Sequence, residues 1–211
     1  DSQYAVAFDD FIDEYSINYR VIQKQRKIAK EAQIPSLEQY KLQPNSMQLG
    51  FIANLEKIRK AGESKALLIS ATGTGKTYAS AFALREEETK KALFLVHREQ
   101  IAKQAIASYK KVFGNTRTFG LLSGNSKDFA VDYLFSTMQM MAKPEILSEF
   151  RRDEFETIII DEAHRTGAAS YQNIMQYFTP KFWLGMTASP ERTDSFDVYE
   201  AFDHNIAYEI R

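Results

Sequence analysis

The sequence predicts an α/β fold in which helices flank a mostly parallel β-sheet, and three observations support this prediction. From about residue 46, short apolar runs alternate with stretches of helical periodicity, as in β-α-β units. The runs Leu67–Ile69 and Ile158–Ile160 contain no polar residue, which is typical of central strands buried on both faces. The glycine-containing turn Thr72–Gly75 joins one apolar run directly to a helical stretch.

These patterns place strands and helices in alternation along the chain. The predicted strands are Ala66–Ser70, Ala92–Val96, Arg117–Leu121, Tyr133–Ser136, Thr157–Ile160 and Phe182–Gly185. The predicted helices are Met47–Lys60, Lys76–Glu87, Glu99–Phe113, Lys143–Phe150 and Ser170–Tyr177. Trp183 lies within a predicted strand and is expected to pack in the core. His204 has no motif around it and is expected to be a structural or surface residue.

Residues 1–43 are predicted to form a small helical appendage, and residues 44–211 to form the main domain. Aromatic and aliphatic side chains recur at helical spacing before residue 20, and Pro35 and Pro44 mark the exit from this region. The first 19 residues contain five acidic groups, and a basic cluster follows at Arg20, Lys24, Arg26, Lys27 and Lys30. We interpret the appendage as a solvated helical segment whose apolar face packs on the main domain. A basic arm that contacts nucleic-acid phosphates is the alternative.

The composition limits the kinds of protein this chain can be. Of its 211 residues, 44% are hydrophobic and 26% are charged, so a packed core is expected. The absence of cysteine excludes disulfides, cysteine-ligated zinc and thiol catalysis, and it agrees with an expected cytoplasmic location. No apolar run reaches the roughly 20 residues of a membrane span, and no signal peptide is visible. The net charge of −1 means that nucleic-acid binding must come from local geometry. Because the chain starts at Asp1 and not at Met, we expect it to be a piece of a longer protein.

The segment from Ser70 to Thr77 has the pattern of a phosphate-binding loop. It follows a buried strand and opens a helix, which is the context that this motif requires. Glycines let backbone N–H groups point at phosphate oxygens, and the helix N-terminus adds a partial positive charge. Lys76 supplies a positive charge for the β- and γ-phosphates, and the Thr77 hydroxyl is placed to coordinate Mg²⁺. The loop therefore predicts ATP and Mg²⁺ as cofactors. Ser70 stands where the general pattern has its first glycine.

A pair of carboxylates follows a second buried strand. Asp161 and Glu162 come directly after the apolar run Ile158–Ile160. Because open α/β sheets bind ligands at the carboxyl ends of their strands, we expect Asp161 to lie beside the phosphate loop. Asp161 is predicted to hold Mg²⁺, directly or through water. Glu162 is predicted to orient and deprotonate an attacking water.

Together, these two segments resemble those of helicase superfamily two. Asp161-Glu162-Ala163-His164 is similar to the motif that names its DEAH-box members. Other segments resemble motifs of the superfamily in the right order: Leu95–Ile101 resembles motif Ia, Phe135–Gln139 the next nucleic-acid motif, and Met186–Pro190 motif III. The run Glu191–Asp194 is similar to the branch of the motor (Res) subunit of type III restriction enzymes. The resemblance covers about residues 44–195.

The resemblance implies a P-loop NTPase domain, the first of two RecA-like domains, and a role for each matching residue. Gln48 would recognise adenine, and the nucleotide would be held by Thr72, Gly73, Thr74, Gly75, Lys76 and Thr77. Lys76 and Glu162 would be catalytic, and Thr77 and Asp161 would hold Mg²⁺. Coupling to motif III would run through His164, Thr187 and Ser189, and the nucleic-acid backbone would be tracked by His97, Arg98 and Thr137.

The implied function is that of an ATP-dependent DNA helicase or translocase, with DNA favoured over RNA and no membrane partner. Its partner would be the second RecA-like domain of the same parent chain, and Phe202–Ile210 is interpreted as the lead into it. Because that domain supplies an arginine finger, the fragment alone is expected to bind Mg-nucleotide but hydrolyse it poorly. Two alternatives stay open. One is a nucleotide-gated protein-interaction switch, and the other is the motor of a restriction or repair nuclease complex.

Overall fold

The computed structural model describes residues 42–71, 73–125, 127, 129–163, 168–188 and 197–210. The predicted helical appendage lies outside the described residues, apart from its last two positions. Three predicted site residues, Thr72, His164 and Ser189, also lie outside them. For Gly73 and Thr74 the structure describes the backbone alone.

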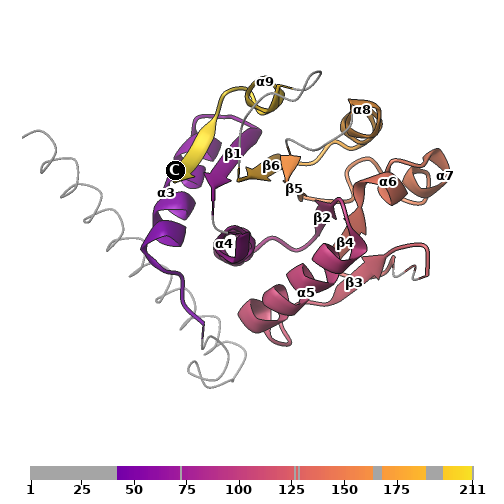
Figure 1. Cartoon of the computed structure of the whole chain (residues 1–211), viewed down its shortest axis with the longest axis horizontal. Helices are drawn as coiled ribbons and strands as arrows, with labels where there is room; N and C mark the ends of the chain where they lie inside the picture. Colours follow the sequence, from indigo (N-terminus) through magenta and orange to yellow (C-terminus); the bar gives the residue numbers. More distant parts are fainter. Residues whose placement is uncertain are drawn as a thin grey trace, which may run out of the picture.

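A parallel sheet of seven strands forms the centre of the described domain (Figure 1). The strands are β1 Lys65–Ser70, β2 Ala92–Val96, β3 Phe119–Leu122, β4 Tyr133–Thr137, β5 Thr157–Asp161, β6 Phe182–Thr187 and β7 Ile206–Ile210. Their order across the sheet is β3-β4-β2-β5-β6-β1-β7, and each neighbouring pair is parallel. The predicted α/β fold with a RecA-like sheet is therefore confirmed.

Helices cover both faces of the sheet, with α3, α4 and α5 on one side and α6 to α9 on the other (Figure 1). The first group comprises α3 Ser46–Lys60, α4 Gly73–Glu86 and α5 Glu99–Phe113. The second comprises α6 Met138–Met141, α7 Pro144–Leu147, α8 Ala168–Tyr177 and α9 Val198–Ala201. None of the described helices has both the length and the apolar character that a membrane crossing requires.

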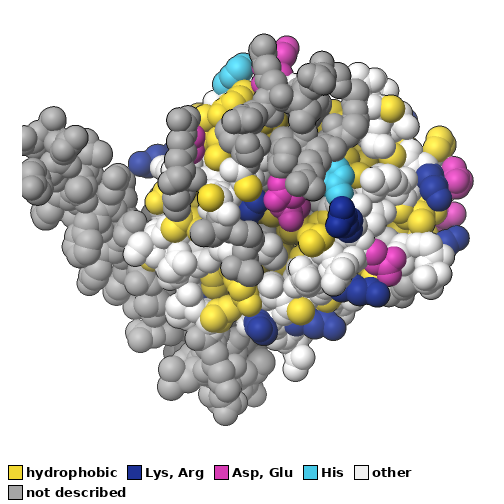
Figure 2. Space-filling model, in the orientation of Figure 1, with side chains coloured by type: hydrophobic (Ala, Val, Ile, Leu, Met, Phe, Trp, Pro, Cys, Tyr) yellow, Lys and Arg dark blue, Asp and Glu magenta, His cyan; other side chains and the backbone are white. Residues whose placement is uncertain are grey.

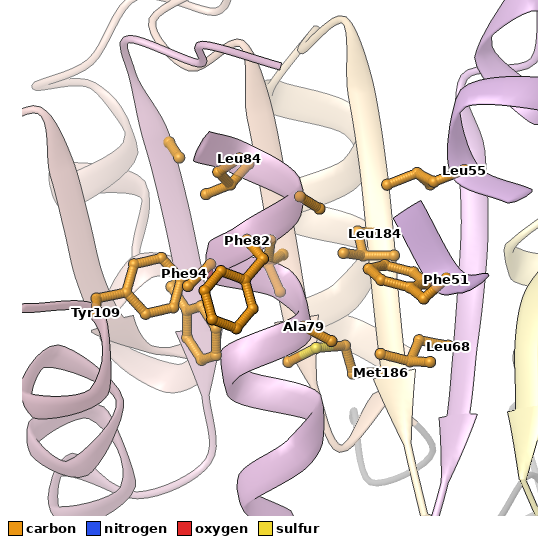
Figure 3. Packing of buried hydrophobic residues seen from close by; sticks show 14 of the residues in the cluster. Phe51, Leu55, Leu68, Ala79, Phe82, Leu84, Phe94, Tyr109, Leu184 and Met186 are labelled. Carbon is orange, nitrogen blue, oxygen red and sulfur yellow. The ribbon is translucent and has the colours of Figure 1, made fainter. Parts of the chain in front are cut away.

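The central strands contain uninterrupted apolar runs because each of their faces belongs to a different hydrophobic core. In β1, Leu68 packs in the core under α3, α4 and α5, whereas Leu67 and Ile69 pack in the core on the other face. Figure 3 shows the first core, where Phe51 of α3 and Phe82 of α4 lie over the strands. Trp183 is buried in the second core, as predicted. This double burial is the physical reason for the non-alternating apolar runs.

The C-terminal segment adds a strand to the sheet that the sequence did not predict. Ile206–Ile210 forms β7, an edge strand parallel to β1. The strand was not predicted because it is short and its pairing partner lies far away in the sequence. That Phe202–Ile210 leads into a second domain stays a prediction. His204 is exposed, as expected, and its ring stacks on that of Tyr199.

Several element boundaries also differ from the predicted ones. The third strand begins at Phe119 and not at Arg117, whose Nε donates to the carbonyl of Thr89. Thr118 instead exchanges hydrogen bonds with Asp132, which close the loop before β4. The predicted helix Lys143–Phe150 shortens to α7, and the short helices α6 and α9 were not predicted.

Candidate functional site

The phosphate loop and the carboxylate pair meet at one edge of the sheet, as the sequence predicts. The loop follows β1 and leads into α4, while Asp161 ends β5, and only β6 separates these two strands. Because all three strands are parallel, their carboxyl ends lie at the same edge. The contact that joins the two segments is direct: the ammonium nitrogen Nζ of Lys76 donates to Oε1 of Glu162 over 3.1 Å.

Lys76 is a buried cation that faces a more accessible carboxylate. Its side chain is 2% exposed, whereas that of Glu162 is 33% exposed. A buried ammonium needs a charged or hydrogen-bonding partner, because its desolvation is otherwise costly. Glu162 meets this need through its contact with Nζ of Lys76. A phosphate group placed at the loop would offer Lys76 the same kind of anionic oxygen.

Asp161 lies beside this pair and is largely buried. Burial raises its pKa to about 6, with a further rise from the charge of Glu162, while the positive charge of Lys76 lowers it. Its Oδ1 accepts the backbone N–H of Glu162 over 2.9 Å. A poorly hydrated carboxylate next to the half-buried Thr77 fits a divalent cation, which prefers hard oxygen ligands. Asp161 and Thr77 are therefore the residues that would hold Mg²⁺.

A cavity of about 380 Å³ opens beside these side chains and extends along α5. It is lined by Lys76, Thr77, Val96, His97, Arg98, Ile101, Gln104, Ala105, Ser108, Asp161 and Glu162. Figure 2 shows that acidic, basic and histidine side chains gather near the middle of this face, with hydrophobic side chains beside them. The cavity therefore combines the predicted phosphate and metal residues with two of the predicted nucleic-acid residues.

Gln48 is buried and also lies against the phosphate loop. Its Nε2 is 3.5 Å from the carbonyl oxygen of Gly75, and its Oε1 accepts the backbone N–H of Asn45 over 2.9 Å. The side chain of Asn45 in turn accepts the backbone N–H of Gln48, which completes a capping box at the start of α3. The sequence analysis missed this box, although Asn followed three residues later by Gln is its usual signal.

The three residues predicted to track nucleic acid lie at the carboxyl ends of β2 and β4: His97 and Arg98 follow β2, and Thr137 is the last residue of β4. Arg98 is exposed and is the N-cap residue of α5. The hydroxyl oxygen of Thr137 caps α6 by accepting the backbone N–H of Met140 over 3.2 Å. His97 is half-buried, and its Nε2 lies 3.3 Å from the carbonyl oxygen of Glu162. Of these three residues, His97 therefore contacts the backbone of the carboxylate pair directly.

Thr187, the one described member of the predicted coupling set, is fully buried at the end of β6. It pairs with Ile69 of β1, one residue before the strand ends at Ser70. This position puts the start of the predicted motif III beside the phosphate loop. His164 and Ser189, which complete the set, lie outside the described residues.

Replacing Asp161 with asparagine is expected to stabilise the nucleotide-free protein at pH 7. The folded state raises the pKa of Asp161 from 3.8 to about 6, so deprotonation above pH 6 costs stability. Stability is lost as the pH rises from about 4 to about 6, and asparagine removes this loss, worth about 1–3 kcal/mol. Thermal unfolding without metal or nucleotide tests this. The midpoint of Asp161→Asn should lie above that of the unmutated protein at pH 7, and the two should converge below pH 4. A lower midpoint for Asp161→Asn at pH 7 would contradict the assignment.

Comparison with known proteins is informative about family and fold. The sequence model of the family described as "Type III restriction enzyme, res subunit" matches residues 41–192. The "Type I restriction enzyme EcoAI endonuclease subunit" of Escherichia coli is 30% identical over 181 residues, which cover 77% of this chain and 22% of that protein. A "Putative ATP-dependent RNA helicase L396" of Acanthamoeba polyphaga mimivirus is 29% identical over 128 residues, 61% of this chain and 24% of that protein. The chain thus spans about a fifth to a quarter of these relatives.

Solved structures share the fold at lower sequence identity. The Pyrococcus furiosus Hef helicase domain has a TM-score of 0.59 and 20% identity, over 75% of this chain and 37% of that chain. The ATP-dependent Type ISP restriction-modification enzyme LlaBIII, bound to DNA, has a TM-score of 0.61 and 19% identity, over 80% of this chain and 15% of that chain. At this level of identity, the two likenesses establish the architecture of the domain and no more.

Proposed function

Because the chain belongs to the family of the type III restriction enzyme res subunit, we propose that it powers movement along DNA by hydrolysing Mg-ATP. The family membership makes it a helicase-like, ATP-dependent motor domain, the first of the RecA-like pair. The observation that carries the proposal is the contact between Lys76 and Glu162, with Asp161 beside it, at the carboxyl edge of the sheet. Phosphoryl transfer to water requires a cation for the phosphates and carboxylates for the metal and the water, and these three side chains would supply them.

In the proposed mechanism, Lys76 exchanges Glu162 for oxygens of the β- and γ-phosphates. Backbone N–H groups of Gly73–Gly75, which form the N-terminus of α4, would hold the phosphates. Mg²⁺ held by Thr77 and Asp161 would neutralise charge on the same phosphates. The exchange releases the carboxylate of Glu162, which then orients the attacking water and accepts its proton. In this scheme the contact between Lys76 and Glu162 would be broken when ATP binds.

DNA is proposed as the track, with Arg98 and Thr137 facing its backbone. Exposed Arg98 and the amide groups at the start of α5 suit phosphate oxygens, whose contacts carry no sequence information. DNA is favoured over RNA because the Escherichia coli relative is named as a restriction endonuclease subunit. The same relative favours a restriction complex as the setting of the motor. A second RecA-like domain of the parent chain would close the site and supply the arginine finger.

The test is ATP hydrolysis by the full-length natural protein, alone and with single-stranded DNA, duplex DNA or RNA. We expect DNA to stimulate hydrolysis, and we expect Lys76→Met to abolish it in every condition. Stimulation by RNA alone would replace DNA as the track. A rate of ATP hydrolysis that depends on Lys76 but does not change with any of the three nucleic acids would instead indicate a nucleotide-gated protein-interaction switch.

Gln48 is proposed to read the adenine base, and Gln48→Glu separates this role from helix capping. Glutamate keeps the oxygen that accepts the N–H of Asn45 but lacks the amide donor. We expect the ratio of ATP to GTP affinity to fall about three- to tenfold, as for one lost hydrogen bond. Repulsion between the new charge and phosphates acts on both nucleotides, so the ratio isolates base recognition. Gln48→Ala should lower both the ratio and the thermal stability, and an unchanged ratio in both variants would rule the role out.

A further inference from the structure

Glu162 has a backbone conformation that residues with a Cβ atom rarely adopt. Its φ angle is 50°, in the left-handed region. Such conformations cost free energy and persist only where neighbouring groups hold them. The residue comes directly after β5, so this turn of the backbone decides where its carboxylate points.

Polar contacts to Asp161, Lys76 and His97 help to hold Glu162 in this conformation. Its backbone N–H donates to Oδ1 of Asp161, at 2.9 Å, and its carboxylate accepts from Nζ of Lys76, at 3.1 Å. The third contact is the 3.3 Å approach of Nε2 of His97 to its carbonyl oxygen. A carbonyl oxygen can only accept, so this hydrogen bond requires a proton on Nε2 of the imidazole.

Sheet register explains why His97 reaches this carbonyl. β2 and β5 are parallel neighbours, and Leu95 pairs with Ile160. Two residues further along each chain, His97 stands opposite Glu162. His97 also directly precedes Arg98, the N-cap residue of α5. The contact therefore links the backbone of the predicted catalytic residue to the loop that begins α5.

The three contacts would not all survive nucleotide binding. This step rests on the proposed function, in which Lys76 turns to phosphate oxygens and Asp161 to Mg²⁺. The carbonyl of Glu162 binds neither phosphate nor metal in that scheme, so its hydrogen bond to His97 can persist. The carboxylate could then turn toward an attacking water while its backbone stays held.

We propose that His97 is a positioning residue for Glu162, holding its carbonyl through Nε2–H so that the carboxylate faces the attacking water. The proposal replaces the nucleic-acid role that the motif resemblance implied for His97. According to this proposal, activity requires a hydrogen-bond donor at Nε2 of His97 and does not require a charged ring.

The first experiment exploits the different reach of two amide side chains in the full-length natural protein. The amide nitrogen of glutamine can take the place of Nε2, whereas that of asparagine takes the place of Nδ1. We expect His97→Asn and His97→Ala to lower kcat for DNA-stimulated ATP hydrolysis about tenfold or more, with KM for ATP and DNA affinity changed less than about twofold. His97→Gln should retain most of kcat.

Two results would overturn the proposal. Equal kcat for the glutamine and asparagine variants would show that no donor at Nε2 is needed. Weaker DNA binding in all three variants, with kcat unchanged at saturating DNA, would show that His97 contacts nucleic acid, as the motif resemblance implies. Failure of the proposed function would be seen separately in the ATP hydrolysis assay. It would appear as an unmutated protein that DNA does not stimulate, or as a Lys76→Met variant that still hydrolyses ATP.

A second experiment needs no hydrolysis. ¹⁵N-histidine labelling and NMR report which imidazole nitrogen of His97 carries a proton, with His97→Gln assigning the signal. We expect a proton on Nε2 in the nucleotide-free protein. A neutral ring protonated on Nδ1 would refute the hydrogen bond, whatever the enzyme assay shows.

Discussion

Replacing Lys76 with methionine is expected to lower the affinity for Mg-ATP about 10- to 100-fold and the rate of hydrolysis about a thousandfold. The affinity loss corresponds to one charge-assisted hydrogen bond in a buried site, about 1.5–3 kcal/mol. The rate falls further because Lys76 also stabilises charge that develops on the transferred phosphoryl group. Methionine keeps the packing of a side chain that is 2% exposed, so the fold should persist. Calorimetric titration with Mg-ATP and a phosphate-release assay measure the two effects.

Lys91→Met is a matched control for this substitution. Lys91 also donates to a glutamate, with 2.8 Å between its Nζ and Oε1 of Glu154, but its side chain is 37% exposed and the pair lies outside the cavity. Surface ion pairs contribute little to stability, so this variant should bind and hydrolyse ATP as the unmutated protein does. Unchanged Mg-ATP affinity in Lys76→Met would refute the assignment of the phosphate loop.

Replacing Gly185 with valine is expected to destabilise the fold by about 3 kcal/mol or more, at the upper end of overpacking effects. Gly185 is buried in β6, between β5 and β1. A Cβ atom at this position would lie 2.6, 2.7 and 2.9 Å from three ring atoms of Phe202, which is itself fully buried. Neither the central strand nor the ring can move away without disturbing the core. The midpoint of urea denaturation should fall accordingly.

Two further variants test whether the ring of Phe202 causes the loss. Gly124→Ala is the control, because a Cβ at Gly124 meets no atom of the described residues within 4 Å, and its stability should stay within about 0.5 kcal/mol. Gly185→Ala is expected to cost less than valine, and combining it with Phe202→Leu should cost less than the sum of the two single changes. Strict additivity would mean that the ring and the glycine do not oppose each other.

The arrangement of the candidate site was predictable because its residues belong to short, continuous sequence motifs. A glycine-rich loop between a buried strand and a helix, together with an acidic pair after another buried strand, needs only a parallel sheet to bring the two together. The sheet order places β6 alone between β1 and β5, so the carboxylates lie beside the phosphate loop as expected, and Lys76 contacts Glu162 directly. The individual roles of these residues in catalysis stay predictions until the variants are measured.

The surroundings of these residues were less accessible to sequence reasoning. Gln48 matched a motif, yet its capping box with Asn45 was overlooked although its pattern is local. His97 matched a motif of nucleic-acid contacts, but the pairing of β2 with β5 brings it to the backbone of Glu162. Register between strands far apart in the sequence leaves no local trace, so no pattern around His97 could reveal this contact.

Local patterns in this chain were enough for the α/β class, for most of the strands and for the loop and carboxylates of the nucleotide site. Hydrophobic periodicity and strand-to-helix turns depend on residues that are neighbours in sequence. Tertiary structure decided the rest: β7 closing the edge beside β1, Phe202 filling the space that Gly185 leaves, and His97 meeting Glu162. Each of these depends on which distant segments become neighbours, and that choice is made by the packing of the whole sheet and its two cores.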